Sequence, residues 1–286
     1  GGQCASAGII PTSAVSHLAR TFAFSAGIVV SASHNPYKDN GIKIFSSAGL
    51  KISDAWEERL EAEIARRPEV RGLEKTDVRP DPVYRREYEH FLRRRFAPGP
   101  GPKGMKIVLD CANGSASAIA PEVFGGLGFT IVATEAEPDG RNINEDCGAL
   151  HPEQLAQTVL SRKADLGIAF DGDADRALWV DHRGRILSGD HTLFVLSRAM
   201  TARGLLRGQA VVATTMSNMG LEKALAADGL SLVRTRVGDK YVLEKMLSIR
   251  ANLGGERSGH TILSDECPTG DGLLTALKML EIMVEK

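Results

Sequence analysis

Residues 164–176 read ADLGIAFDGDADR, an apolar run that ends in three alternating aspartates. The run at 166–170 has no polar alternation, which is typical of a strand buried on both faces of a sheet. Asp171, Asp173 and Asp175 follow at intervals of two residues. Because three carboxylates held this close repel one another, the pattern favours a bound hard cation.

The ligand set of this loop narrows the choice of metal. It contains only carboxylates, with no His or Cys nearby, which favours Mg²⁺ over Zn²⁺. An EF-hand is excluded, because its sixth and twelfth positions would be Arg176 and His182 instead of Gly and Glu. A solvated acidic turn is the alternative, and the buried strand before the loop argues against it. We therefore predict one Mg²⁺ site at Asp171, Asp173 and Asp175.

Around this loop, short apolar strands alternate with helical patterns, which predicts an α/β fold with mixed sheets flanked by helices. In the helix that begins after Ser53, residues Trp56, Leu60 and Ile64 fall on one face. We expect a hairpin turn at 182–184. The expected strands are 26–31, 42–45, 106–110, 129–132, 165–170, 176–180, 185–187, 210–213 and 232–235. The other expected helices are 81–96, 115–124, 152–161, 218–226, 241–247 and 272–284.

The chain has 286 residues, enough for two or three domains. The stretch APGPGP at 97–102 cannot continue a helix and is the clearest linker. A further strand–helix series begins near Gly208. We expect domains at 1–98, 103–204 and 205–286, the first of them incomplete.

Composition excludes several classes of protein. The chain has 35 Lys and Arg against 36 Asp and Glu, so its net charge of −1 does not suit a nucleic-acid or membrane-surface binder. The arginines at 93–95 stand beside Glu87 and Glu89, as on a solvated helix face. No apolar run approaches the length of a membrane span, and the first residues carry no basic region, so we expect neither a span nor a signal peptide.

The cysteines are far apart and include no CxxC pair, which argues against a disulfide scaffold or a zinc site. This usage suits a reducing cytoplasm. The four are Cys4, Cys111, Cys147 and Cys267.

Three other loops carry polar side chains suited to chemistry. SASHNP at 31–36 places Ser33 and His34 directly after a buried strand, where α/β sheets open their ligand crevices; the alternative is an ordinary turn. GGERSGH at 254–260 alternates Glu256, Ser258 and His260, a hydrogen-bonding set suited to a polyol, although such a His is often structural. RTRVGDK at 234–240 could hold an anion at a helix start, or be a solvated loop.

Together these loops resemble the α-D-phosphohexomutase superfamily. Residues 31–36 are similar to its phosphoserine loop, 171–176 to its metal loop and 255–260 to its sugar-binding loop, in the family's order. The branch that acts on glucosamine phosphates is the most similar, over essentially the whole chain. The stretches that support this are 142–144 with 147–148, 164–176, 216–218, 237–242 and 269–272.

The resemblance implies roles for individual residues. Ser33 would carry a phosphoryl group and, with the three aspartates, hold Mg²⁺. Arg176 would meet the phosphoryl group, and Lys43 and His260 are the candidates for proton transfer, with His34 lining the phosphoserine loop. Contacts to the substrate are implied for Glu256, Ser258, Arg236, Gly238 and Asp239.

The implied reaction converts glucosamine 6-phosphate to glucosamine 1-phosphate through a bisphosphate, on the route to cell-wall amino sugars. Alternatives are a phosphomannomutase or phosphoglucomutase, a non-catalytic module that binds a sugar phosphate beside a metal, and a Ca²⁺-binding structural domain. The partner expected is a hexosamine phosphate, with no nucleic acid and no membrane; a homodimer stays open.

The chain departs from the superfamily pattern in two places. It lacks the N-terminal Gly-Thr-Asp-Gly-Ile-Arg-Gly segment. It also lacks the fourth domain, whose Ser/Thr-Gly-Thr loop and Arg anchor the non-reacting phosphate. We therefore expect an internal fragment whose own turnover is in question.

Overall fold

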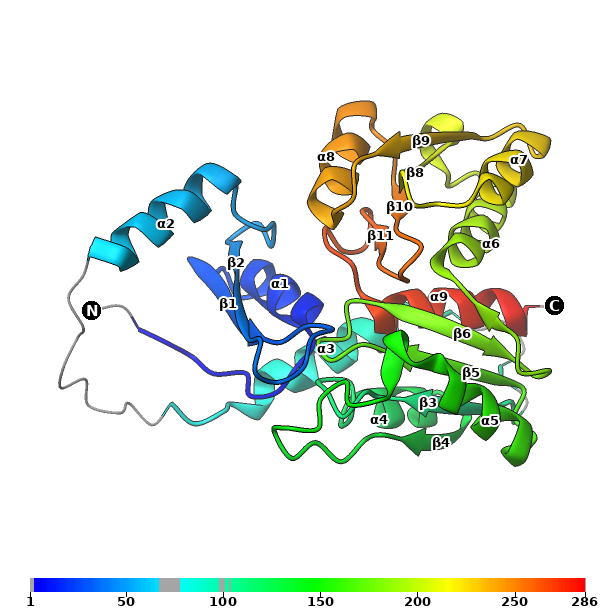
Figure 1. Ribbon diagram of the computed structural model, residues 1–286, viewed down its shortest axis with the longest axis horizontal. Helices are drawn as coiled ribbons and strands as arrows, with labels where there is room; N and C mark the ends of the chain where they lie inside the picture. The colour runs from blue at the N-terminus through cyan, green and yellow to red at the C-terminus, as the bar shows by residue number, and fades with distance from the viewer. Residues whose placement is uncertain (1–2, 67–77, 98–100, 103, 286) are drawn as a thin grey trace.

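The computed structural model describes residues 3–66, 78–97, 101–102 and 104–285 (Figure 1). Three α/β units follow one another along the chain, each built around its own sheet. Part of the linker expected at 97–102 lies outside the described residues. The mixed sheets flanked by helices confirm the predicted fold class.

The described residues form strands and helices close to the predicted ones. The strands are β1 (Ala26–Ser31), β2 (Gly41–Ser46), β3 (Lys106–Asp110), β4 (Thr130–Thr134), β5 (Leu166–Phe170), β6 (Ala177–Asp181), β7 (Ile186–Leu187), β8 (Ala210–Thr214), β9 (Ser231–Thr235), β10 (Leu253–Gly255) and β11 (Thr261–Leu263). The helices are α1 (Thr12–Thr21), α2 (Asp54–Arg66), α3 (Pro82–Arg94), α4 (Ala120–Gly126), α5 (Pro152–Arg162), α6 (Gly189–Ala202), α7 (Met219–Ala227), α8 (Asp239–Ile249) and α9 (Gly272–Val284), with short 3₁₀ turns at Gly148–Leu150 and Arg207–Gln209.

The central sheet has the strand order β4-β3-β5-β6-β7. β3 pairs in parallel with β4 and β5, whereas β6 runs antiparallel to β5 and β7. Every residue of β5 is buried, as its unbroken apolar run predicts. On β3, Ile107 and Leu109 belong to the main core while Val108 packs with Leu155 and Val159 of α5. Both faces of the sheet are therefore covered, and the metal loop leaves β5 inside the fold.

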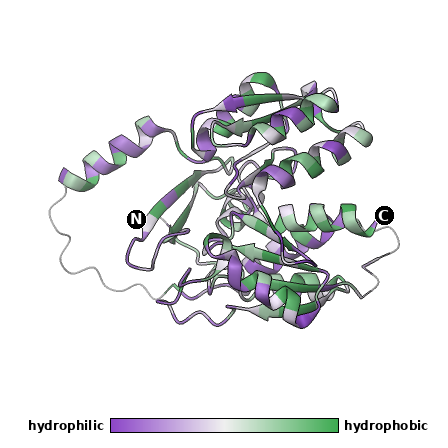
Figure 2. Cartoon of the chain, turned by 45° about the vertical axis from the view of Figure 1, so that its right-hand side comes forward, coloured by the Kyte–Doolittle hydropathy of each residue, from purple (hydrophilic) through white to green (hydrophobic). Residues whose placement is uncertain are grey.

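The third unit repeats this arrangement with the order β11-β10-β8-β9. Val212 of β8 packs against Val242 and Met246 of α8, while Val211 and Ala213 face the main core. α9 lies between this unit and the central sheet and contacts β6, α6, α3 and β11 (Figure 1). Figure 2 shows α9 as a largely hydrophobic helix, and ten of its 13 residues are buried.

The sheet of the first unit is covered on one face only, unlike the sheets of the other two units. β1 and β2 form an antiparallel pair against which α1 packs. The opposite face leaves Ile28, Val30 and Ile42 more than 60% exposed. α2 has no buried residue, so the face that carries Trp56 and Ile64 lies open.

Two features differ from the sequence expectation. The helix expected at 115–124 begins only at Ala120, because residues 115–119 form turns: the Ser115 N–H donates to the Gly172 carbonyl and Ser117 Oγ donates to the Gly114 carbonyl. α1, α6, β10 and β11 were not predicted. The buried face of α1 includes Thr12, Ser13 and Ser16, so it has no apolar periodicity to detect.

Within the described part of the chain, none of the helices combines the length and the apolarity that crossing a bilayer requires.

The two tryptophans allow a matched test of the core. Trp179 on β6 is 1% exposed and donates its Nε1–H to Thr192 Oγ1 at 3.0 Å. Trp179→Phe removes this bond and leaves a void, so we expect a loss of about 2 kcal/mol in the free energy of unfolding, measured in urea. Trp56→Phe, at an exposed residue, should change it by less than about 0.5 kcal/mol. Equal losses of unfolding free energy in the two variants would contradict the placement of Trp179 in the core and of Trp56 at the surface.

Candidate active site

The three aspartates lie on the loop between β5 and β6. All three are buried, and one oxygen of each lies within 4.8 Å of the others. The loop is stabilised by its own backbone, since the Ala174 N–H donates to the Asp171 carbonyl and the Gly272 N–H donates to the Ala174 carbonyl. The start of α9 therefore holds the metal loop in place.

The donor atoms fit a divalent cation. Among the residues that the structure describes, Asp171 Oδ2, Asp173 Oδ1 and Asp175 Oδ1 are buried and have no hydrogen-bond partner. Buried carboxylate oxygens are costly without a partner. A hard cation such as Mg²⁺ takes carboxylate oxygens, and each of the three aspartates offers one oxygen within 4.8 Å of those of the other two, close enough to share one ion.

The other oxygens of Asp173 and Asp175 are bound by side chains of the first unit. Lys43 Nζ, from β2, lies 2.5 Å from Asp173 Oδ2 and 3.3 Å from Asp175 Oδ2. Thr12, at the first residue of α1, donates its hydroxyl to Asp173 Oδ2 and its backbone N–H to the Asp173 carbonyl. The first unit is thus attached to the metal loop.

The surroundings of this cluster shift the pKa values of Asp171 and Asp175 in opposite directions. Burial raises the pKa of Asp171 well above its usual value, and the neighbouring Asp175 and Asp173 raise it further. Burial would also raise the pKa of Asp175, but its electrostatic interactions with His260, Lys43 and Arg176 outweigh burial and lower that pKa.

The pKa of Lys43 moves upward. Burial would lower it, but the attraction of Asp175 and Asp173 is stronger. Lys43 is therefore a cation in this arrangement. To act as a base, Lys43 would need a lowered pKa, whereas its pKa here is raised.

Ser33 lies beside this cluster. Its Oγ is 3.5 Å from Lys43 Nζ. Its φ is +54°, a left-handed conformation that typically costs a non-glycine residue about 1–3 kcal/mol. Its carbonyl oxygen lies so close to Gly172 that a Cβ there would stand 2.5 Å away, so this approach requires glycine. The phosphoserine-like loop and the metal loop therefore meet directly.

Two further basic residues belong to the loops that meet here: His34 follows Ser33 in the chain, and Arg176 follows the third aspartate. The pKa of His34 is lowered, first by burial and then by the positive charge of Arg176. Arg176 Nε lies 3.8 Å from both Asp171 Oδ2 and Asp175 Oδ1. Arg176 therefore lies beside two of the three carboxylates, and its charge also acts on His34, the residue after Ser33.

His260 connects the cluster to the third unit. It is 3% exposed, and its Nε2 lies 4.0 Å from Asp175 Oδ2 and 3.6 Å from Asp239 Oδ2. Burial would raise the pKa of Asp239, but His260 and Lys51 together lower it. Lys51 follows β2, so its ion pair with Asp239 joins the first and third units.

The remaining predicted substrate residues lie next to Asp239. Glu256 Oε1 accepts the Gly238 N–H at 3.1 Å, and Ser258 Oγ lies 3.5 Å from Glu256 Oε2. Arg236 is exposed, with its guanidinium 3.5 Å from the centre of the Tyr241 ring. Among the described residues, no hydrogen bond or ion pair joins Arg236 to the metal loop. Ser33, Lys43, Arg176 and His260 do contact this loop, directly or through one residue.

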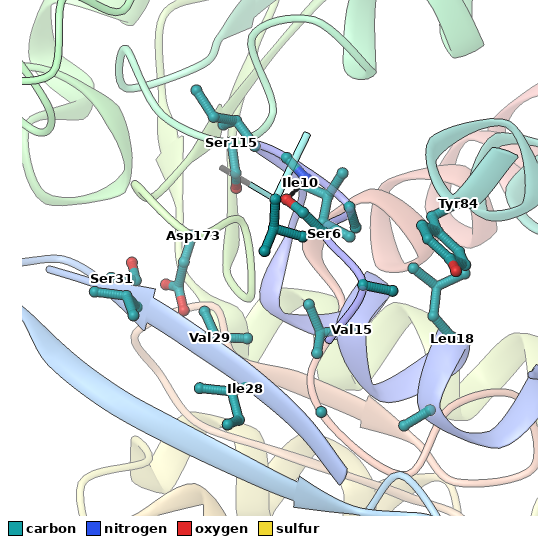
Figure 3. Close-up of a pocket in the computed structure, with 18 of the residues that line it drawn as sticks. Ser6, Ile10, Val15, Leu18, Ile28, Val29, Ser31, Tyr84, Ser115 and Asp173 are labelled. Carbon is teal, nitrogen blue, oxygen red and sulfur yellow. Dashed lines mark hydrogen bonds between the residues drawn. The ribbon is translucent and has the colours of Figure 1, made fainter. Parts of the chain in front are cut away.

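A separate hollow of about 1320 Å³ runs along β1 (Figure 3). Apolar side chains such as Val15, Ile28 and Val29 line much of it. Of the predicted site residues only Asp173 borders it. The hollow therefore adjoins the polar cluster at Asp173, but its other lining residues lie outside the predicted site.

Sequence reasoning missed several residues of the site. Thr12 and Lys51 carry no motif, and Asn144 was noted only as part of a similar stretch. Thr12 and Asp173 are 161 residues apart, so no local pattern could connect them.

Family models of phosphoglucomutase/phosphomannomutase α/β/α domains I, II and III match residues 1–71, 89–184 and 188–286. The phosphoglucosamine mutase of Solibacter usitatus is 47% identical over 99% of this chain, and that of Koribacter versatilis is 50% identical over 98%. The chain spans 63% and 62% of the length of these relatives.

Solved structures of similar fold belong to the same family as these sequence matches. A phosphoglucomutase/phosphomannomutase family protein from Burkholderia thailandensis has a TM-score of 0.81 and 28% identity, over 98% of this chain and 62% of that one. N-acetylphosphoglucosamine mutase of Aspergillus fumigatus, in complex with GlcNAc-6P and magnesium, has a TM-score of 0.58 and 18% identity, over 96% and 74%. With three consecutive domain matches and three loops that meet in one cluster, this chain belongs to the phosphoglucomutase/phosphomannomutase family.

Proposed function

We propose that this chain holds the catalytic centre of a phosphoglucosamine mutase. The observation that carries the proposal is the position of Ser33 Oγ, 3.5 Å from Lys43 Nζ, which in turn binds two of the three clustered aspartates. Curated relatives of that name, 44–50% identical to this chain, support the choice of sugar. The domain bounds 1–98, 103–204 and 205–286 belong to the same proposal.

Mg²⁺ held by Asp171, Asp173, Asp175 and an oxygen of phospho-Ser33 would supply positive charge to the transferring group. The carboxylates do not themselves meet that group; they hold the cation. Phosphoryl transfer depends mainly on positioning and charge neutralisation, because its transition state is loose and spreads charge over the phosphoryl oxygens. Arg176 and Lys43 add two further positive charges at this place.

In the proposed reaction, a hydroxyl oxygen of glucosamine 6-phosphate forms a bond to the phosphorus of phospho-Ser33. The bond between that phosphorus and Ser33 Oγ breaks. The hydroxyl proton leaves to a base, for which His260 is the candidate, and cationic Lys43 gives a proton to Ser33 Oγ at 3.5 Å. The reverse steps return the other phosphate of the bisphosphate to Ser33 and leave glucosamine 1-phosphate.

Sugar recognition is assigned to the third unit. Glu256 presents an acceptor that Gly238 and Ser258 orient, and these two residues flank it from different loops. Asp239 lies within ion-pair distance of His260 and can align its ring. Arg236 stays exposed, available to an anionic group of the substrate.

A cytoplasmic location is part of this proposal, since Cys111, Cys147 and Cys267 are buried free thiols and Cys4 is free as well. A homodimer stays a prediction from sequence.

Sugar choice is tested by comparing kcat/KM for the 6-phosphates of glucosamine, mannose and glucose, using the natural gene product that contains this chain. We expect a preference for glucosamine 6-phosphate of at least about 10-fold, because a site built to bind an amino group leaves polar atoms unpaired with a hydroxyl sugar. A preference for mannose or glucose 6-phosphate would favour the phosphomannomutase or phosphoglucomutase alternative.

The role of Ser33 is tested by intact mass after incubation with a hexose bisphosphate. We expect the wild-type chain to gain one phosphoryl group, and Ser33→Ala to gain none, since the accepting oxygen is removed. Ser161→Ala, at an exposed serine of α5, serves as the control and should behave as wild type. Binding of the bisphosphate without any mass gain in the wild type would support the non-catalytic alternative.

The metal site is tested by calorimetric titration with Mg²⁺. Asp173→Asn should weaken Mg²⁺ binding by at least about 10-fold, because an amide oxygen lacks the carboxylate's charge. Asp228→Asn, at a surface ion pair with Arg198, should leave the titration unchanged. An unchanged titration in Asp173→Asn would remove this residue from the site, and a clear preference for Ca²⁺ would favour the structural alternative.

A further inference from the structure

Asn144 belongs to the second unit, yet its side chain binds the loop that carries Ser33. Its Nδ2 group donates two hydrogen bonds, one to the Ser33 carbonyl at 2.8 Å and one to the Asn35 carbonyl at 2.9 Å. These two carbonyls lie on either side of His34. Both amide hydrogens of Asn144 are therefore used to hold one turn of a loop 111 residues away in sequence.

The backbone fixes this side chain in its position. The Asn144 N–H donates to the Ala112 carbonyl at 3.0 Å, directly beyond β3. Its φ is +58°, a left-handed conformation that Asn tolerates better than most residues. Asn144 is 9% exposed. Its neighbour Ile143 contacts Gly172 of the metal loop closely enough that a Cβ on Gly172 would lie 2.6 Å from Ile143 Cδ1.

Within its own loop, Ser33 is held by short-range bonds only. Its N–H donates to Ser31 Oγ, and the Asn35 N–H donates to the Ala32 carbonyl. These bonds shape the turn but do not place it against the metal loop. Lys43 reaches Ser33 Oγ, but through a long and flexible side chain. Asn144 is the buried, backbone-anchored group that ties the turn to the second unit.

We propose that Asn144 is a positioning residue for phosphoryl transfer at Ser33. By holding both carbonyls around His34, it keeps Ser33 in its left-handed conformation with Oγ toward the aspartates. The inference rests on the proposed role of Ser33; Asn144 binds the main-chain carbonyl of Ser33 and not its hydroxyl, and among the described residues none of its hydrogen bonds goes to the three aspartates. A displacement of about 1 Å in the reacting atom can reduce a rate by about 100-fold.

Three variants separate this role from general stability. Asn144→Gly keeps the left-handed backbone and removes the side chain. Asn144→Asp keeps the size but replaces the two donors by acceptors that face carbonyl oxygens. Asp146→Gly is the control. Asp146 lies in the same loop as Asn144, is exposed and has a φ of +53°. Its replacement by glycine adds the same backbone freedom but leaves the hydrogen bonds of Asn144 to the Ser33 loop in place.

The first measurement follows the rate of phosphate uptake by the chain from glucose 1,6-bisphosphate, by intact mass, at increasing bisphosphate concentration. We expect both Asn144 variants to lower the maximal rate by about 10- to 100-fold while the half-saturating concentration changes less than about twofold. The Asp146→Gly control should match the wild type. Uptake in the Asn144 variants at the wild-type rate would overturn the inference.

The second measurement is amide hydrogen exchange of the peptide that covers residues 31–40, which needs no phosphate. We expect faster exchange in both Asn144 variants than in the wild type and the control. Unchanged exchange would overturn the inference even if Ser33 takes up phosphate. A wild-type chain that takes up no phosphate, with exchange that still responds to Asn144, would overturn the proposed role of Ser33 while the assigned contact between the loops remains supported.

Discussion

The structure depends on how three buried carboxylates are neutralised. Asp171, Asp173 and Asp175 follow a strand that is buried on both faces, so water cannot solvate their charges. Lys43 of β2 and Arg176 of the loop itself supply positive charge, and His260, from the loop before β11, lies 4.0 Å from Asp175 Oδ2. Contacts to this one loop of the second unit therefore involve side chains of the first and third units.

The same balance suits the proposed chemistry. A dianionic phosphoryl group added to Ser33 would enter a region where Arg176 and Lys43 already supply positive charge. The negative charge of three carboxylates and a phosphoryl group together exceeds these two positive charges. The aspartate oxygens that accept no hydrogen bond fit the cation that would supply the rest. Once this charge is neutralised, phosphoryl transfer depends mainly on the position of Ser33. The contacts that hold the Ser33 loop are therefore important for the rate.

The first unit is placed by polar contacts as well as by its core. Its two-stranded sheet leaves one face open, with Ile28 and Val30 exposed. Thr12 and Asn144 connect this unit to the second one through hydrogen bonds to Asp173 and to the Ser33 loop. Ion pairs of Lys51 with Asp239 and of Lys240 with Asp54 connect it to the third. Ser33 therefore faces the metal loop although its own sheet is small.

The sequence alone was sufficient for elements that are largely buried: β3 and α9 match the predicted bounds, and β5 differs from its predicted bounds by one residue, because unbroken or periodic apolar runs record burial. β1 also matches its predicted bounds, but it was expected to be a buried strand and only alternate residues of it are buried, because one face of its small sheet is uncovered. The sequence also pointed to the metal loop, since charge repulsion is visible in residue types. Tertiary structure decided the rest. α1 buries small polar side chains, and the bonds of Thr12 and Asn144 join loops 161 and 111 residues apart. Such contacts depend on how separate units pack, and hydrogen bonds between distant loops leave no periodicity in the sequence.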